Sequence, residues 1–492
     1  MSQKIFNTAT RKKEIFQPIK EGAIGIYVCG ITAYDVCHIG HARAAIVFDV
    51  VVRYLRSKGY EVTYVKNFTD IDDKIINRAN KEGVSITEIS ERYIKSHDED
   101  MAALGVLTPT VVPRATEHMK EMIALISSLE EKGFAYSVDG DVYFSISNYR
   151  QYGGLSGRNL EEMMAGARVD VNDKKKNPLD FALWKKSKEG EPSWESPWGK
   201  GRPGWHIECS AMSRRYLGET FDIHGGGEDL IFPHHENEIA QSMASTGKPL
   251  ANYWMHNGFV KINSEKMSKS LGNIFPVREI LKNYHPEVLR LFMLQSHYRS
   301  PVDYSEDSLT EARAGLLRGY RTLQLIKELQ GKITAANQVS KKSAAQEESY
   351  ISKFKELKEK FNEAMDDDFN TAQALGYVFD TVRLINNFIV DEKNVSSSGK
   401  AIILNAAKKT FDHFGAVLGI FQSDADHFFI SDKETELRKR GLNIDEIENL
   451  VKQRQSAREE KDWSRADDIR KKLSQLNIVL KDSADGTSWM IE

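Results

Sequence analysis

The stretch Tyr27-Val28-Cys29-Gly30-Ile31-Thr32-Ala33-Tyr34-Asp35-Val36-Cys37-His38-Ile39-Gly40-His41 decides the first part of the fold. It begins in an apolar run, Ile24 to Val28, and leads into the apolar segment Ala42 to Leu55. This pattern predicts a strand, a loop and a helix, and Lys58-Gly59 is typical of a helix end. Val62 to Val65 predicts the next strand. A strand, a crossover helix and a second strand form a βαβ unit, so we expect a parallel sheet.

The turn His38-Ile39-Gly40-His41 is suited to hold a triphosphate. Gly40 has no Cβ, so a ligand can lie against the backbone there. The helix that follows offers free N–H groups and the positive end of its dipole to a phosphate. His38 and His41 can donate hydrogen bonds to phosphate oxygens. For this tetrapeptide alone, an ordinary capped helix with no ligand remains an alternative.

A second cationic motif, Lys266-Met267-Ser268-Lys269-Ser270, lies far downstream in a polar segment ahead of Pro276. Two lysines three positions apart, with small polar residues around them, can close over a departing pyrophosphate and neutralise its charge. Lysines usually lie in solvated surface turns, which is the alternative. The two motifs together are more specific than either one.

The chain has three cysteines, Cys29, Cys37 and Cys209, and they form no CxxC pair. A zinc finger or ribbon is therefore not expected. His234 and Glu238 are four residues apart, a spacing that places them on one face of a helix. With the thiolates of Cys29 and Cys209 they would form a zinc ligand shell. Spacing alone leaves the alternative that the cysteines are small buried hydrophobic residues.

These motifs resemble the paired signatures of class I aminoacyl-tRNA synthetases, and the chain as a whole resembles the cysteinyl-tRNA synthetase family. The resemblance covers essentially the whole chain and is carried by Tyr27 to His41, Asn67 to Lys74, Gly204 to Met212, Phe221 to Glu238, and Lys266 to Asn273. It implies one zinc ion, held by Cys29, Cys209, His234 and Glu238, that binds the thiolate of the substrate. An ordinary pocket separates cysteine from serine by only ~10- to 200-fold, whereas zinc strongly prefers a thiolate.

The resemblance also implies the other site residues. His38, His41, Lys266 and Lys269 would be catalytic, and ATP with Mg²⁺ would be bound by these four together with Thr32, Gly40 and Ser268. Cysteine would be bound by Thr69, Trp205, His224 and Asp229, with Asp229 facing its ammonium group. The implied reaction makes cysteinyl-adenylate and pyrophosphate and then charges tRNA(Cys), without a covalent protein intermediate.

Length and composition bound the remaining predictions. At 492 residues the chain is too long for one core. Its net charge of −3 indicates that any tRNA contact is local. We find no signal peptide and no apolar run of about 18 residues for a membrane span. We therefore expect a cytoplasmic protein, and we expect a monomer because every apolar stripe is accounted for.

We expect an α/β fold: a Rossmann-like parallel-sheet catalytic domain with an insertion, followed by a helical bundle and a small C-terminal anticodon-binding domain. The predicted ranges are 1–305 for the catalytic domain, with an insertion at about 115–200 and the lysine loop at 266–270. The bundle, expected to contact the tRNA stem, covers 306–425, and the tail covers 430–492.

The tail combines a basic helical face with Trp489, which we expect at the surface. Cations suit phosphates and a ring suits base stacking, so this is a candidate RNA surface. Acidic neighbours such as Glu459 and Asp467 leave a plain solvated helix as an alternative. Two other functions remain open. A ligase that transfers cysteine to an amino-sugar would share the catalytic core but lack this tail, and a binding-only paralogue would have lost a signature His or Lys.

Overall fold

The structure is a computed structural model, and it describes residues 2–159, 174–262, 265–266, 274–333, 341–391, 395–483 and 486–491. At its centre lies a four-stranded sheet in the order β10-β9-β3-β4, in which every neighbouring pair is parallel. The strands are β3 (Ala23–Thr32), β4 (Glu61–Thr69), β9 (Phe221–Gly227) and β10 (Ala251–Asn257). The predicted parallel sheet and α/β fold class are confirmed.

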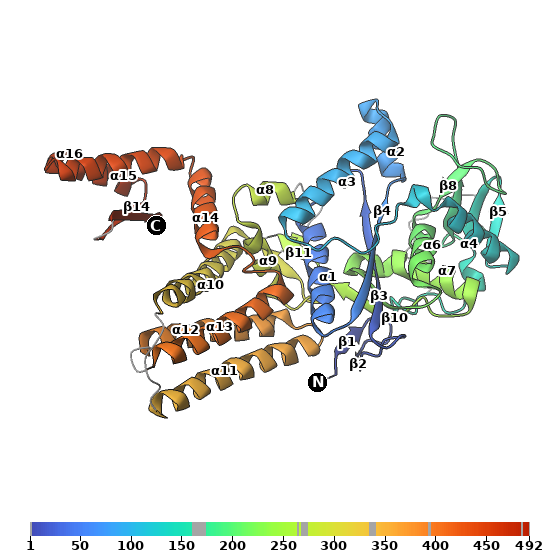
Figure 1. The fold of residues 1–492 in the computed structure, drawn as a ribbon. Helices are drawn as coiled ribbons and strands as arrows, with labels where there is room; N and C mark the ends of the chain where they lie inside the picture. Colours follow the sequence, from blue (N-terminus) through green and yellow to red (C-terminus); the bar gives the residue numbers. More distant parts are fainter. Residues whose placement is uncertain are drawn as a thin grey trace.

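Helix α1 (Ile39–Ser57) connects β3 to β4, as the apolar segment predicted. Most of its residues from Ala42 to Leu55 are buried, because it lies between the sheet and the helical bundle (Figure 1). The helix ends at the cap residue Lys58, and Gly59 follows with a φ of +92°, a conformation that favours glycine.

A separate antiparallel sheet stands between β4 and β9 in the chain. Its order is β5-β6-β7-β8, with β5 (Ala135–Val138), β6 (Asp141–Phe144), β7 (Phe181–Lys186) and β8 (Gly201–Pro203). The turn at Asp139-Gly140 has positive φ at both residues, as the predicted hairpin requires. Three helices precede this sheet: α2 (Asp73–Glu82), α3 (Ile86–Ala103) and α4 (Met119–Glu131).

Two further helices pack against each other beside the central sheet. Helix α6 (Trp205–Leu217) precedes β9, and α7 (Glu236–Thr246) connects β9 to β10. A small sheet of order β12-β11-β13 follows, made of β11 (Val260–Ile262), β12 (Glu265–Lys266) and β13 (Val302–Tyr304), with α8 (Val277–Leu281) and α9 (Pro286–Leu294) between β12 and β13. The N-terminal residues form the hairpin of β1 (Lys4–Asn7) and β2 (Lys12–Ile15).

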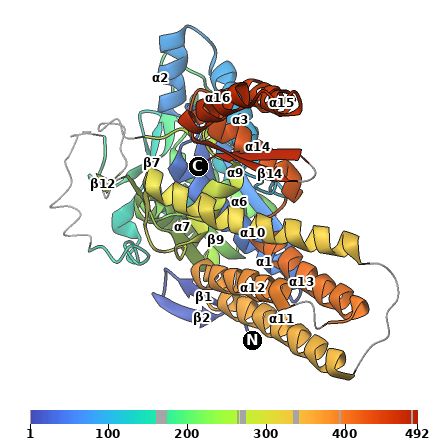
Figure 2. The same ribbon diagram turned by 90° about the vertical axis from the view of Figure 1, so that its left-hand side faces the viewer.

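The second half of the chain is almost wholly helical. The bundle consists of α10 (Glu306–Lys332), α11 (Lys341–Asp366), α12 (Thr371–Asp391), α13 (Ser397–Leu418) and α14 (Ala425–Lys439). In Figure 2 the long helices α11, α12 and α13 lie side by side, and their buried side chains are continuous with the core around α1. Because this core extends across residue 305, the domain boundaries stay predictions.

The tail has its own small core. It consists of α15 (Ile444–Glu459), α16 (Trp463–Gln475), β14 (Ile478–Ser483) and β15 (Gly486–Ile491), packed through Ile447, Leu473, Trp489 and their neighbours. The expectation that Trp489 is exposed is wrong. Only 7% of its surface is accessible, because its ring fills this core and its Nε1 donates to Glu448 over 3.0 Å. Within the described residues, no helix is long and apolar enough to cross a membrane.

Candidate active site

The site begins where the pairing of β3 and β4 is interrupted, between Val28 and Ile31. The backbone of Gly30 lies so close to β4 that a Cβ there would stand 1.5 Å from the carbonyl oxygen of Asn67. The amide of Gly30 donates to Asn67 Oδ1 over 2.9 Å. Only glycine fits this approach. Cys29 therefore lies at the irregularity, three residues before β3 ends at Thr32.

Two thiols, an imidazole and a carboxylate converge at this point. Cys29 comes from β3, Cys209 from α6 and Glu238 from α7, while His234 lies in the turn Ile231–His235. Their potential ligand atoms all lie within 4.8 Å of one another. Cys29 Sγ is 3.6 Å from Cys209 Sγ and 3.4 Å from Glu238 Oε1.

The structure gives His234 and Glu238 the helical spacing that the sequence predicted. The helical turn Ile231–His235, which contains His234, runs directly into α7 at Glu236. His234 Nε2 lies 3.1 Å from Glu238 Oε1, four positions further along the chain. The two side chains therefore lie on one face.

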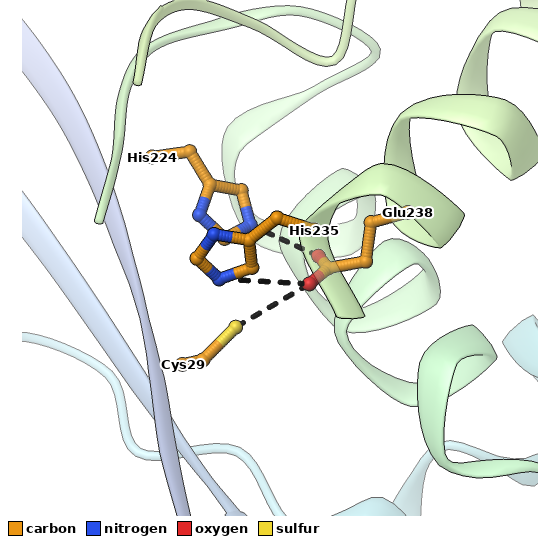
Figure 3. Close-up of side chains that lie close together, drawn as sticks. All are labelled: Cys29, His224, His235 and Glu238. Carbon is orange, nitrogen blue, oxygen red and sulfur yellow. Dashed lines mark hydrogen bonds and ion pairs between the residues drawn. The ribbon is translucent and has the colours of Figure 1, made fainter. Parts of the chain in front are cut away.

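A second set of donors shares two of these residues. Cys29, His224, His235 and Glu238 also have ligand atoms within 4.8 Å of one another, and Figure 3 shows their side chains pointing toward one another. His224 Nε2 is 2.9 Å from Glu238 Oε2, and His235 Nε2 is 4.0 Å from Glu238 Oε1. The sequence did not single out His235, although the pair His234-His235 was a visible signal.

Burial sets the protonation of these groups. Burial raises the pKa of the Cys29 thiol well above its usual range, and the neighbouring Cys209 adds to this effect. Burial lowers the pKa of His234 to about 3 and that of His235 well below its usual value. Burial alone would raise the pKa of Glu238, but His224 and His234 outweigh it, so the pKa is lowered. Neutral imidazoles beside a carboxylate are good metal donors, and a metal ion would favour the thiolates.

Trp205 and Thr69, two of the residues expected to bind cysteine, lie close to the cluster. The ring of Trp205 stacks on His234 with centroids 4.2 Å apart, and 39% of its surface is exposed. The hydroxyl of Thr69 donates to Glu208 Oε2 over 2.6 Å. Burial raises the pKa of Glu208 well above its usual range. Glu208 was not singled out from the sequence.

His224 and Asp229, the other two residues expected to bind cysteine, differ in environment. His224 is fully buried, and its ring stacks on Trp254 with centroids 4.3 Å apart. Its place behind Glu238 suits support of that carboxylate. Asp229 is exposed in the short turn Glu228–Leu230 that follows β9.

The expected nucleotide turn is compact. The rings of His38 and His41 stack with centroids 3.7 Å apart, and His38 caps α1 by accepting from the amide of Gly40 over 3.2 Å. Thr32 lies beside Thr69 in the β3–β4 pairing.

The segment that follows the lysine motif returns to this turn. The amide of Ile39 donates to Phe275 O over 3.0 Å, and the amide of Val277 donates to Cys37 O over 2.9 Å. Lys266 lies in β12, whereas Ser268 and Lys269 lie outside the described residues.

Comparison with known proteins identifies the family. Residues 15–314 match the model of the class I (C) tRNA synthetase catalytic domain, 360–422 match the DALR domain, and 444–489 match the cysteinyl-tRNA ligase anticodon binding domain. The chain is 55% identical to the cysteine–tRNA ligases of Geobacter sulfurreducens and Geobacter metallireducens, over 100% of this chain and of each relative. The chain belongs to the cysteine–tRNA ligase family.

Members of this family are enzymes of the class I synthetase fold, and solved structures agree with that fold. Methionyl-tRNA synthetase of Mycobacterium tuberculosis, in complex with methionyl-adenylate, superposes with a TM-score of 0.61 at 16% identity, covering 83% of this chain and 93% of that chain. The ternary complex of Agrobacterium radiobacter K84 agnB2 LeuRS, tRNA and LeuAMS gives 0.59 at 12% identity, covering 85% and 86%. These likenesses show the fold alone. Since the family models include an anticodon-binding tail, the chain has the tail that an amino-sugar ligase would lack.

Proposed function

We propose that this enzyme activates L-cysteine with ATP and transfers it to the 3′ end of tRNA(Cys), and that zinc selects the thiol. The relatives named as cysteine–tRNA ligases support the substrates. The observation that carries the zinc assignment is the convergence of Cys29, Cys209, His234 and Glu238 at the end of the strand that leads into the His38 turn. This convergence supports a proposed site for a thiol beside the proposed site for a triphosphate.

The donor set fits zinc. Two thiols, one imidazole and one carboxylate are ligands that zinc accepts in tetrahedral geometry. The buried imidazole of His234 is neutral at physiological pH because its pKa is about 3. His224 Nε2 donates to Glu238 Oε2 over 2.9 Å, the kind of outer contact that orients a ligand. When bound, the ion would supply a Lewis acid with a strong preference for a thiolate over a protonated hydroxyl.

The proposed activation step forms one bond and breaks one. A carboxylate oxygen of cysteine attacks the α-phosphorus of ATP, the bond to the β-phosphate oxygen breaks, and pyrophosphate leaves with Mg²⁺. His38 and His41 would donate hydrogen bonds to the phosphates, and Lys266 and Lys269 would neutralise the charge on the leaving group. Thr69, Trp205, His224 and Asp229 would bind and orient the amino acid.

The transfer step follows from the same site. The terminal ribose hydroxyl of tRNA attacks the carbonyl carbon of cysteinyl-adenylate, and AMP leaves with the electron pair of the broken bond. Contacts with the bundle and with α15 and α16 would position the tRNA. We propose that the enzyme works in the cytoplasm as a monomer.

Aminoacylation tests this proposal. Purified protein should attach cysteine, and not serine, to tRNA(Cys), and it should not attach cysteine to an amino-sugar acceptor. Transfer of cysteine to the amino-sugar instead of tRNA would favour the alternative function, a ligase that acts on an amino-sugar. Activation without any transfer to tRNA would contradict the proposed second step.

A further inference from the structure

The loop His297 to Ser300, between α9 and β13, lies outside every sequence motif yet is held by a buried cation. Arg43 Nη2 donates to the carbonyl oxygens of His297, Tyr298 and Ser300 over 3.0, 3.3 and 3.3 Å. Its Nη1 donates to Met293 O. Arg43 is 1% exposed and stands two positions after His41 on α1. The backbone of the loop is thus attached to the helix that begins at the nucleotide turn.

The side chains of the same loop are held by the helical bundle. Tyr298 Oη donates to Asp368 Oδ1 over 2.8 Å, and Arg299 Nε donates to Asp368 Oδ2 over 2.9 Å. Asp368 is fully buried in the link between α11 and α12, and it also accepts from the amide of Phe6 over 2.8 Å. Its φ is +66°, a left-handed conformation that aspartate tolerates better than most residues. Its carboxylate therefore has charged, hydroxyl and amide donors around it.

The loop also contacts the segment that leads to Lys266. The amide of Gly258 donates to Tyr298 O over 2.9 Å, and the amide of Val302 donates to Phe259 O over 3.0 Å. A Cβ on Gly258 would stand 2.7 Å from Arg299 O and from Ser300. From Gly258 the chain continues into β11 and then β12, which contains Lys266. One loop therefore contacts both segments that carry the phosphate-binding motifs.

We infer that Asp368, a bundle residue, is a positioning residue for the activation step. It fixes the loop 297–300, and the loop fixes α1 through Arg43 and β11 through Gly258. A displacement of about 1 Å at a reacting group can cost on the order of a hundredfold in rate. The inference rests on the proposed function.

Asp368→Asn tests the inference by cysteine-dependent ATP–pyrophosphate exchange without tRNA. The amide keeps an oxygen for Phe6 and Tyr298 but loses the charge that faces Arg299. We expect kcat to fall about tenfold, with a smaller change in KM for ATP and cysteine. Arg43→Lys keeps a charge but cannot contact four carbonyls at once, so we expect a similar loss of kcat. The two losses combined in one protein should be less than additive, because they act through one loop.

Asp432→Asn is the matched control. Asp432 is a buried carboxylate of the bundle. It accepts from Arg313 Nε and Nη2 over 2.8 and 2.7 Å, and these two contacts join α14 to α10 without involving the loop 297–300. We expect it to lower thermal stability and leave kcat unchanged. Tyr298→Phe, a milder change, replaces Asp368→Asn if that variant does not fold. Unchanged kcat in folded Asp368→Asn or Tyr298→Phe, or an equal loss in Asp432→Asn, would overturn the inference. Absence of exchange in the unsubstituted protein would instead contradict the proposed function.

Discussion

The Sγ atoms of Cys29 and Cys209 lie 3.6 Å apart, although 180 positions separate the two residues in the chain. Both cysteines are free, so the two sulfurs are separate donors and not a disulfide. The irregular end of β3 supplies one, and the start of α6 supplies the other. The hydrogen bond from Cys29 lowers the pKa of the Cys209 thiol, but burial and the carboxylate of Glu238 outweigh it, so that pKa is raised. Burial also raises the pKa of Cys29. A shared cation would favour both thiolates.

Removal of one thiol should therefore remove the metal. We expect Cys209→Ser, purified without added metal, to contain much less zinc than the unsubstituted protein when measured by elemental analysis. Mutation of a residue that contacts only a metal ligand typically lowers metal affinity ~10- to 100-fold. Loss of a direct ligand should lower the zinc affinity by at least as much. Cys37→Ser is the matched control, since Cys37 is buried away from the cluster, and it should retain zinc. Full zinc in Cys209→Ser would contradict the assignment.

Single histidine variants separate the two donor sets. If the ion is held by Cys29, Cys209, His234 and Glu238, His234→Asn should lose zinc and His235→Asn should keep most of it. His235 Nε2 lies 4.0 Å from Glu238 Oε1, farther than His234 Nε2 at 3.1 Å. Metal titration of both variants makes the comparison. Loss confined to His235→Asn would assign the ion to the set with His224.

The sequence predicted the helices and strands better than the tertiary contacts around individual residues. The βαβ unit, the hairpin at Asp139-Gly140 and the helical second half follow from local patterns, which is why they were found. The convergence of Cys29 with Glu238 depends on tertiary packing; residue types and spacing left it as one alternative, and the family resemblance favoured it. Trp489 illustrates the limit: an aromatic residue in a short basic tail suggests exposure, but this tail forms a core of its own around that ring.

Glu208, His235 and Asp368 were missed for a related reason. Each is a charged or polar residue whose role depends on burial next to residues distant in sequence, and no local spacing reveals burial. Asn67 carried a partial signal, since it is the first residue of the family stretch Asn67 to Lys74, but its close contact with Gly30 became evident only in the structure. Polar residues of this kind are common on surfaces, so sequence patterns alone do not distinguish them.

The exposed ring of the tail is Trp463, and it yields a prediction for RNA binding. Trp463 is 60% exposed at the start of α16, which carries Arg465, Arg470 and Lys472. Stacking of a base on an aromatic ring contributes about 1–3 kcal/mol. We expect Trp463→Ala to raise KM for tRNA about tenfold while pyrophosphate exchange without tRNA is unchanged. An unchanged KM for tRNA would show that this ring does not contact the RNA.

Trp489→Ala is the comparison variant, because the ring of Trp489 is in the core of the tail. Removal of a buried tryptophan costs about 3–5 kcal/mol, so we expect local unfolding of the tail. Circular dichroism and limited proteolysis between residues 440 and 491 should detect it. If the tail of Trp489→Ala resists protease as well as the tail of Trp463→Ala does, the assignment of Trp489 to the core is contradicted.

His285 gives a prediction for acid stability. Burial lowers its pKa to about 4 from 6.5, and its Nδ1 accepts from the amide of Glu287 at the start of α9. Below pH 6.5 the unfolded chain binds a proton that the folded protein excludes, so the free energy of unfolding falls as pH falls from 6.5 toward 4. At pH 5 this one group lowers the free energy of unfolding by at most about 2 kcal/mol.

His285→Asn retains a cap acceptor and does not titrate. We expect the free energy of unfolding, measured by urea denaturation, to fall less between pH 7 and pH 5 for His285→Asn than for the unsubstituted protein. Equal losses in the two proteins would mean that His285 is not held neutral in the fold.

The most direct test of the whole account is cysteine-dependent ATP–pyrophosphate exchange, without tRNA, before and after removal of zinc. We predict exchange with cysteine and none with serine, loss of exchange on chelation, and recovery when zinc is added back. Exchange that persists in fully chelated protein would contradict the role of zinc at Cys29, Cys209, His234 and Glu238. No exchange from folded, zinc-loaded protein would contradict the proposed function itself.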